Sequence, residues 1–166
     1  MASIELIKSF EGFRGSPYKD PTGNPTVGYG HLCQKADCSE LGYKYPISKA
    51  EGEKLLQKDL KRYEQCLASA VKVKLNANQY GALTSWTFNM GCGNMQSSTL
   101  VKRLNNKEDP QTVAEQELPR WNKGGNPPKV LPGLTRRRAA EVDLFKKKTD
   151  VGAIPCIKSL IEFQEL

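Results

Sequence analysis

The chain has 166 residues, of which 38% are hydrophobic, enough for one domain or for a domain with two lobes. No window approaches the roughly 18 consecutive apolar residues of a transmembrane helix, so we expect no membrane insertion. Lys and Arg number 25 against 18 Asp and Glu, and the resulting charge of +7 favours an anionic partner. On charge alone, nucleic acid and an anionic wall polymer are equally open. Basic residues are spread thinly outside 136–138 and 146–148, which provides no concentrated stripe for reading DNA.

Two elements are predicted at the start of the chain. Apolar residues at helical spacing over 4–10 predict an amphipathic helix that ends near Glu11. From residue 16 to residue 32, Gly and Pro break any helix, while Tyr, Thr and Val favour short strands. We therefore expect a small antiparallel hairpin with Asp20 at or near its turn.

The rest of the chain is predicted to be mainly helical. Expected helices cover residues 48–67, 76–90, 98–104, 109–121 and 134–147, with a Gly/Pro-rich loop over 124–132. The first begins with a capping box, Ser48 with Glu51, and the fourth has Asp109 as N-cap before Pro110. The predicted fold class is α+β, mostly α: a small N-terminal β-hairpin lobe and a helical C-terminal lobe joined by a long helix.

Glu11 and Asp20 form the first candidate for catalytic chemistry. Two carboxylates that face each other across a groove are the minimum equipment for splitting a glycosidic bond. The apolar helix end at Glu11 favours a neutral acid, whereas the polar turn at Asp20 favours a charged carboxylate. Unlike surroundings would give the two groups separate acid and base roles. On spacing alone, a surface Glu and a turn Asp remain an ordinary alternative.

Five cysteines are present, at positions 33, 38, 66, 92 and 156. The chain lacks a Cys-x-x-Cys pair and has one histidine, so we expect no structural metal site. Disulfides suit a secreted protein better. A local bridge between Cys33 and Cys38 and a second between Cys66 and Cys92 are the candidate pairs, which leaves Cys156 odd. Spacing alone leaves the connectivity open.

Three stretches of the sequence together resemble the phage-type lysozymes, glycoside hydrolase family 24. The resemblance covers about residues 3–156. It is carried by Glu11, Tyr18, Asp20, Gly23, Thr26, Gly28, Gly30 and His31, by Phe88-Asn89-Met90-Gly91, and by Leu131-Pro132-Gly133-Leu134 with the arginines after it. The cysteines resemble a secreted, fungal-like branch of that family.

The resemblance implies three catalytic residues. Glu11 would be the general acid, Asp20 would stabilise the positive sugar ring and help to place the water, and Thr26 would hydrogen-bond the attacking water. The family inverts the anomeric configuration, which requires about 6.5–9.5 Å between the carboxyl groups. No metal or organic cofactor is implied, because acid and water suffice.

Further residues have expected roles in binding or support. Candidates for substrate binding are Tyr29, Leu32, Phe88, Asn89 and Arg137. Phe88 would pack on a sugar face, and Asn89 would hydrogen-bond an acetamido or backbone-like group. The family sets an arginine of the last helix against the catalytic Glu, and we choose Arg137, with Glu141 one turn later to hold it.

His31 is expected to act in support. A lone histidine is more often packed or paired than catalytic, and the family places an acidic partner where Asp59 stands. We therefore expect an ion pair between His31 and Asp59 that ties the small lobe to the linking helix.

The predicted protein is an N-acetylmuramidase that hydrolyses β-1,4 bonds in bacterial peptidoglycan. It would act as a secreted, bacteriolytic monomer without a nucleic-acid partner, and its signal peptide is expected to be absent from this sequence because residues 2–12 carry charges. Alternatives are a glycosidase of chitin or chitosan, a catalytically weak wall-binding protein, and a basic nucleic-acid binder.

The expected domain covers residues 1–156. Its small lobe would span about 13–47, and its helical lobe about 68–150 plus the N-terminal helix. Residues 157–166 form a tail of unknown role.

Overall fold

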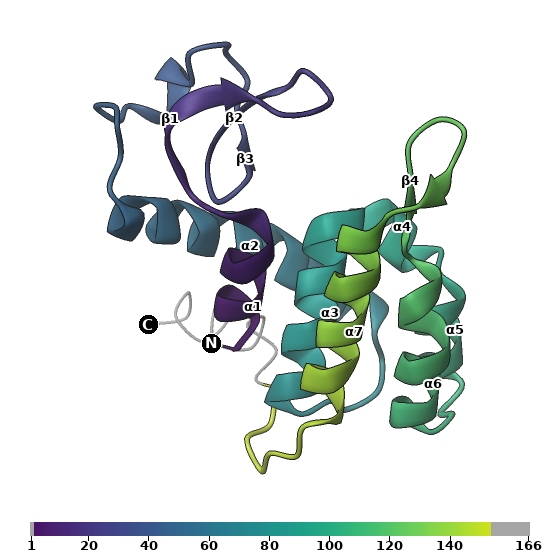
Figure 1. Cartoon of the computed structure of the whole chain (residues 1–166). Helices are drawn as coiled ribbons and strands as arrows, with labels where there is room; N and C mark the ends of the chain where they lie inside the picture. Colours follow the sequence, from purple (N-terminus) through teal and green to yellow (C-terminus); the bar gives the residue numbers. More distant parts are fainter. Residues whose placement is uncertain (1, 154–166) are drawn as a thin grey trace, which may run out of the picture. The chain divides into compact units, whose positions relative to one another are not determined.

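The structure is a computed structural model that describes residues 2–153 (Figure 1). The expected tail at 157–166 and Cys156 lie outside the described residues. The chain divides into an N-terminal unit, residues 4–61, and a helical unit, residues 2–3 and 62–153. Within residues 2–153, no helix combines the length and the apolar character needed to cross a membrane.

The N-terminal unit combines a small antiparallel sheet with two helices. Its elements are α1 (Ala2–Glu11), β1 (Arg14–Lys19), β2 (Pro25–Gly28), β3 (His31–Leu32), a 3-10 helix at Ser39–Leu41 and the first part of α2 (Lys49–Ala70). The sheet order is β1-β2-β3, so the predicted hairpin gains a further short strand. A core cluster of Val27, Cys38, Ile47 and Leu55 lies beneath it.

Helix α1 belongs largely to the N-terminal unit. Lys8 of α1 forms an ion pair with Glu53 of α2 at 2.8 Å. Just after α1, the Phe13 ring lies so close to Gly52 that a Cβ there would approach the ring to 2.6 Å. The missing side chain at Gly52 thus allows the chain after α1 to pack against α2.

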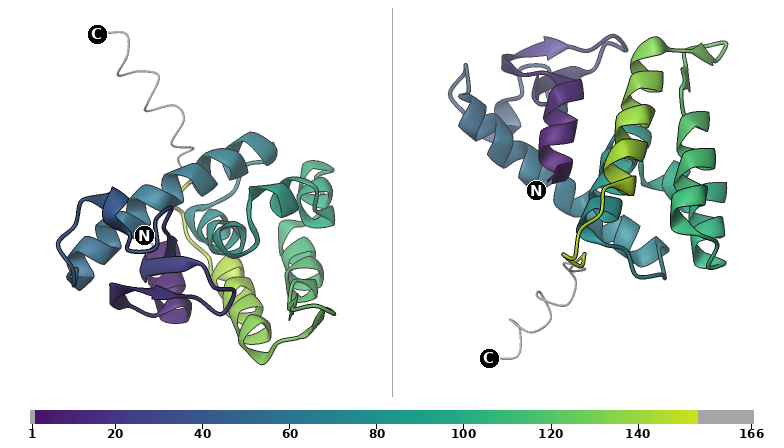
Figure 2. Two further views of the ribbon diagram at one scale, coloured as in Figure 1. Left: turned by 90° about the horizontal axis from the view of Figure 1, so that it is seen from above. Right: turned by 60° about the horizontal axis from the view of Figure 1, so that its bottom comes forward.

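The helical unit is built around two helices that lie side by side, α3 (Ala77–Met90) and α7 (Pro132–Lys146) (Figures 1 and 2). Its other elements are the end of α2, α4 (Cys92–Gln96), α5 (Thr99–Asn105), α6 (Pro110–Glu117), β4 (Lys123–Gly124) and β5 (Lys129–Val130). Trp86 and Phe145 are fully buried in the core.

The predicted helix starts agree with the capping contacts of the structure. Ser48 and Glu51 exchange backbone-to-side-chain hydrogen bonds at 2.7 and 3.1 Å, as a capping box requires. Asp109 accepts a hydrogen bond from the Thr112 backbone N–H at 2.9 Å. Local side chains therefore determine where α2 and α6 begin.

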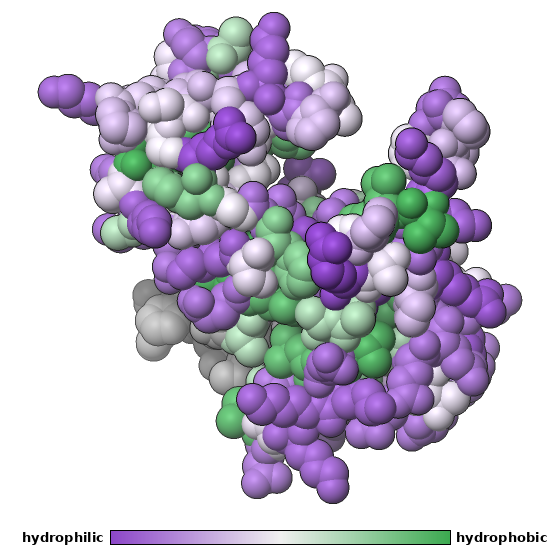
Figure 3. Space-filling view, in the orientation of Figure 1, coloured by the Kyte–Doolittle hydropathy of each residue, from purple (hydrophilic) through white to green (hydrophobic). Residues whose placement is uncertain are grey.

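The predicted loop over 124–132 differs from the structure. Residues Lys123–Gly124 pair with Lys129–Val130 in a short hairpin, and α7 begins at Pro132, where the missing N–H costs no helical hydrogen bond. Figure 3 shows green apolar residues near this hairpin, and Val130 is 55% exposed.

Two disulfides join the cysteine pairs that the sequence suggested. Cys33 and Cys38 close a loop of sequence separation 5, and Cys66 of α2 joins Cys92 of α4 across a separation of 26. In the chain-entropy model, a longer loop restricts the unfolded chain more.

We predict that the two disulfides differ in their contribution to stability. Replacing Cys66 and Cys92 by Ser should lower the free energy of unfolding by about 3.5 kcal/mol, against about 2 kcal/mol for Cys33 and Cys38. Urea titrations of the two double variants measure both values. Equal losses, or a larger loss for the short loop, would contradict the entropic explanation.

Candidate functional site

Glu11 is the last residue of α1 and is half-buried. A Cβ added to Gly30 would lie 3.0 Å from Oε2 of Glu11, and Gly30 has φ +85°. A glycine at position 30 therefore allows both the turn between β2 and β3 and the close approach of the Glu11 carboxyl group.

Asp20 follows β1 and is held by the turn that it begins. Its Oδ1 atom accepts hydrogen bonds from the Thr22 hydroxyl at 2.7 Å, the Thr22 backbone N–H at 2.8 Å and the Asn24 backbone N–H at 2.9 Å. These bonds, led by that from the Thr22 hydroxyl, hold the pKa of the Asp20 carboxyl below its usual value. Oδ2 accepts no hydrogen bond from residues 2–153. Asp20 is thus a fixed carboxylate with one uncommitted oxygen.

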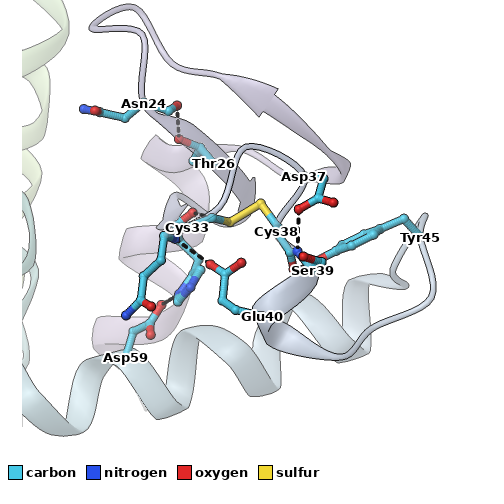
Figure 4. Close-up of a disulfide and its surroundings, with 11 residues drawn as sticks. Asn24, Thr26, Cys33, Asp37, Cys38, Ser39, Glu40, Tyr45 and Asp59 are labelled. Carbon is cyan, nitrogen blue, oxygen red and sulfur yellow. Dashed lines mark hydrogen bonds and ion pairs between the residues drawn. A yellow bond between two sulfur atoms is a disulfide. The ribbon is translucent and has the colours of Figure 1, made fainter.

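Thr26 lies in β2 and is 2% exposed. Its hydroxyl donates to the Asn24 backbone oxygen at 3.0 Å, as the dashed line in Figure 4 shows. A hydroxyl has one hydrogen to donate. Because this hydrogen is engaged, the Thr26 oxygen can serve a further partner only as an acceptor.

The structure brings His31 and Asp59 together. Nδ1 of His31 lies 2.7 Å from Oδ2 of Asp59 on α2. Figure 4 shows Asp59 together with the Cys33–Cys38 disulfide. Glu40 accepts a hydrogen bond from the Gln34 backbone N–H within the same loop. The pair thus links β3 to α2.

Two other candidates of this unit differ in exposure. The Tyr29 ring is 7% exposed and packs against Phe13 at 5.1 Å between ring centroids. Leu32 at the end of β3 is 59% exposed. Leu32 can therefore touch a ligand directly, whereas little of the Tyr29 ring is available to one.

Phe88 and Asn89 lie in the last turn of α3, and both are half-buried. The Phe88 ring contacts that of Tyr63 edge-on, with 5.2 Å between centroids. Oδ1 of Asn89 accepts a hydrogen bond from Nη2 of Arg138 at 3.0 Å. Asn89 is therefore tied to α7 by an arginine that was not among the expected site residues.

Glu141 joins both arginines of α7 to α3. Its Oε1 lies 3.4 Å from Nε of Arg137 and accepts from Ser85 at 2.7 Å, and its Oε2 lies 2.8 Å from Nε of Arg138. Burial raises the pKa of the Glu141 carboxyl, and it lowers the pKa of Arg138 to about 10. The predicted support of Arg137 by Glu141 is present, but it belongs to a larger buried cluster.

The expected site residues are divided between the units. The N-terminal unit holds Glu11, Asp20, Thr26, Tyr29 and Leu32, and the helical unit holds Phe88, Asn89 and Arg137. Sequence reasoning did not single out Thr22, whose hydroxyl bonds to Asp20, or Arg138, whose bond to Asn89 spans 49 positions of sequence. An Asp-x-Thr turn could have indicated Thr22, but no local pattern indicates Arg138.

Metal ligands are not grouped in the described part of the chain. Among residues 2–153, no set of three or more His, Cys, Asp and Glu side chains is placed to hold a metal ion.

Comparison with known proteins identifies the family. The phage lysozyme family model matches residues 8–141, and the chain belongs to this family. The endolysin of Bacillus phage PZA is 39% identical over 150 residues, which are 89% of this chain and 55% of that protein. The endolysin of Salmonella phage P22 is 38% identical over 135 residues, 81% of this chain and 89% of that protein. The chain spans about half the length of the two Bacillus phage endolysins that it matches.

Solved structures share the lysozyme fold. The endolysin from Escherichia coli O157:H7 phage FAHEc1 superposes with a TM-score of 0.77 at 30% identity, covering 89% of this chain and 92% of that one. The muramidase domain of SpmX from Asticaccaulis excentricus gives 0.75 at 30% identity, covering 89% and 96%. The predicted lysozyme-like α+β fold is confirmed. The expected fungal-like branch of the family stays a prediction.

We predict that Thr22→Val raises the pKa of Asp20 toward its usual value, because the substitution removes the hydroxyl donor that contributes most to the low value. An NMR titration of the Asp20 carboxyl carbon measures the shift.

Thr112→Val is the matched control, because Thr112 donates to Asp109 in the same way from its hydroxyl and its backbone. It should raise the pKa of Asp109 and leave that of Asp20 unchanged. An unchanged Asp20 titration in Thr22→Val would show that the hydroxyl bond does not fix the charge.

Proposed function

We propose that this protein is an N-acetylmuramidase that hydrolyses the β-1,4 bond between N-acetylmuramic acid and N-acetylglucosamine in bacterial peptidoglycan. Membership of the phage lysozyme family supports the reaction class. The observation that carries the proposal is the contrast within one unit between a half-buried Glu11 at a helix end and an Asp20 held as a carboxylate by its turn. That contrast suits separate acid and stabilising roles.

In this mechanism Glu11 protonates the leaving glycosidic oxygen, and Asp20 stabilises the positive charge that develops on the sugar ring. The uncommitted Oδ2 of Asp20 suits this task, because Oδ1 is occupied by the turn. Thr26 accepts a hydrogen bond from the attacking water, since its own hydrogen is engaged with Asn24. The water attacks the anomeric carbon from the face opposite the leaving oxygen, which inverts that carbon, and its proton passes to the Asp20 carboxylate.

Substrate binding is assigned to five residues, Tyr29, Leu32, Phe88, Asn89 and Arg137. The exposed Leu32 and the half-buried Phe88 offer apolar surface to sugar faces.

We further propose that the protein is secreted and acts as a bacteriolytic monomer. Its two disulfides support an oxidising compartment.

We predict that Glu11→Gln loses nearly all turnover while sugar binding is retained, because the amide keeps the shape of the acid but cannot protonate the leaving group. Loss of the general acid should lower kcat about 100- to 10,000-fold. Product release from purified peptidoglycan measures turnover, and the retention of muropeptides on the immobilised variant measures binding.

Glu5→Gln is the control in the same helix, because Glu5 is exposed and bonds only to Lys8 among residues 2–153. This variant should keep wild-type turnover.

NMR of fresh products should show the α anomer, as inversion requires. Retained turnover in Glu11→Gln, β products, or release from chitin oligomers in place of peptidoglycan would refute the assignment.

We predict that lysis of whole cells slows as salt rises, because the charge of +7 attracts the protein to an anionic wall. At 0.15 M salt, charges more than about 8 Å apart are largely screened. A short soluble muropeptide, which carries far fewer charges than a cell wall, is the control, and its hydrolysis should depend much less on salt. Cell lysis that is indifferent to ionic strength would remove electrostatic attraction from the mechanism.

A further inference from the structure

The side-chain amide of Asn89 has a fixed direction. A guanidinium group carries only hydrogen-bond donors, so the atom of Asn89 that lies 3.0 Å from Nη2 of Arg138 must be the oxygen Oδ1. The nitrogen Nδ2, with its two N–H donors, is therefore on the other side of the amide. It makes no hydrogen bond with residues 2–153, although Asn89 is only half-buried.

The side chain of Arg138 is held in place by burial and by Glu141. Arg138 is fully buried. Its Nη2 also donates to Oε1 of Glu141 at 2.9 Å, and its Nε lies 2.8 Å from Oε2. Glu141 is in turn fixed to α3 by the Ser85 hydroxyl. An unsupported asparagine can present either its oxygen or its nitrogen to a ligand, but this cluster leaves Asn89 a single orientation.

A pair of outward N–H donors distinguishes sugar substituents. Hydroxyl groups both donate and accept, so they can bind either face of an amide. The carbonyl oxygen of an N-acetyl group only accepts, and it needs the nitrogen face. The ammonium group of a de-N-acetylated sugar only donates, and it needs the oxygen face. An Asn89 that presents its nitrogen can therefore bind the carbonyl oxygen of an N-acetyl group but not an ammonium group.

We propose that Arg138 is a positioning residue that makes Asn89 a dedicated hydrogen-bond donor, and that this donor selects N-acetylated over de-N-acetylated sugar at the substrate site. The inference rests on the proposed function, because it assumes that Asn89 faces a glycan. Arg138 acts through Asn89 and does not touch the substrate.

Asn89→Asp tests the donor directly. The aspartate can still accept from Arg138, so the buried cluster is preserved, but its outward atom becomes an acceptor. On N-acetylated glycan chains, KM should rise about three- to tenfold, with kcat changed less, as expected for loss of a binding hydrogen bond. On the same chains after chemical de-N-acetylation, KM should fall relative to wild type, so that the preference shrinks or reverses.

Asn106→Asp is the matched control, because it adds the same charge at an exposed C-cap of the same unit. It should keep the wild-type ratio of KM values on the two substrates. An unchanged ratio in Asn89→Asp would overturn the proposal.

Arg138→Gln tests positioning. A glutamine can both donate and accept, so Asn89 should regain both orientations, and the preference for acetylated chains should weaken. In the Asn89→Ala background, Arg138→Gln should have no further effect on that preference. An effect of equal size in both backgrounds would show that Arg138 has a merely structural role. If Arg138→Gln does not fold, Asn89→Asp alone decides whether the donor exists.

The proposed function and this inference fail in different ways. A wild-type protein that releases nothing from N-acetylated peptidoglycan would refute the muramidase assignment. Normal wild-type turnover with the same KM on acetylated and de-N-acetylated chains would refute only the role of Asn89 and Arg138.

Discussion

A carboxylate with no exposed surface, Glu141, holds α3 and α7 together, and the geometry of the helical unit depends on it. Burying an ion costs several kcal/mol unless partners offset the lost hydration. Here Arg137, Arg138 and Ser85 supply those partners from one turn of α7 and from α3. Removing one partner of such a pair typically costs about 3–5 kcal/mol. The cluster therefore permits one arrangement of its side chains, and the direction of Asn89 follows from it.

Internal hydrogen bonds also fix polar side chains in the N-terminal unit. The turn after β1 occupies Oδ1 of Asp20 with three donors, and the Asn24 carbonyl occupies the one hydrogen of Thr26. In each case, an internal hydrogen bond engages one donor or acceptor of a polar side chain, so that only its remaining donors or acceptors are available to a ligand. Asp20 retains a charged acceptor, Thr26 retains a neutral acceptor, and Asn89 retains donors.

The sequence predicted those features that local chemistry determines. The capping box at Ser48, the N-cap at Asp109 and the turn at Asp20 each depend on residues within a few positions, and they are present. The arginines at 136–138 could not be assigned in this way. A basic run usually indicates a solvated helix face, yet Arg137 and Arg138 are 4% and 0% exposed.

Their burial depends on Ser85 and Asn89, about fifty residues earlier. Helix α1 is a similar case. Its apolar face can be predicted from the sequence, but the sequence does not indicate that α1 packs against α2. Long-range partners thus explain most of what the sequence could not predict.

The position of Glu11 depends on links that compensate for a small core. Small units bury a low fraction of their surface and are hard to stabilise by apolar contacts alone. The N-terminal unit adds the Cys33–Cys38 disulfide, the His31–Asp59 pair and the ion pair of Lys8 with Glu53. Two of these hold β3, and the third holds α1 on α2. Gly30 precedes β3 and Glu11 ends α1, so these same links bring the turn at Gly30 close to the Glu11 carboxyl group. The interactions that stabilise the N-terminal unit therefore also position Glu11.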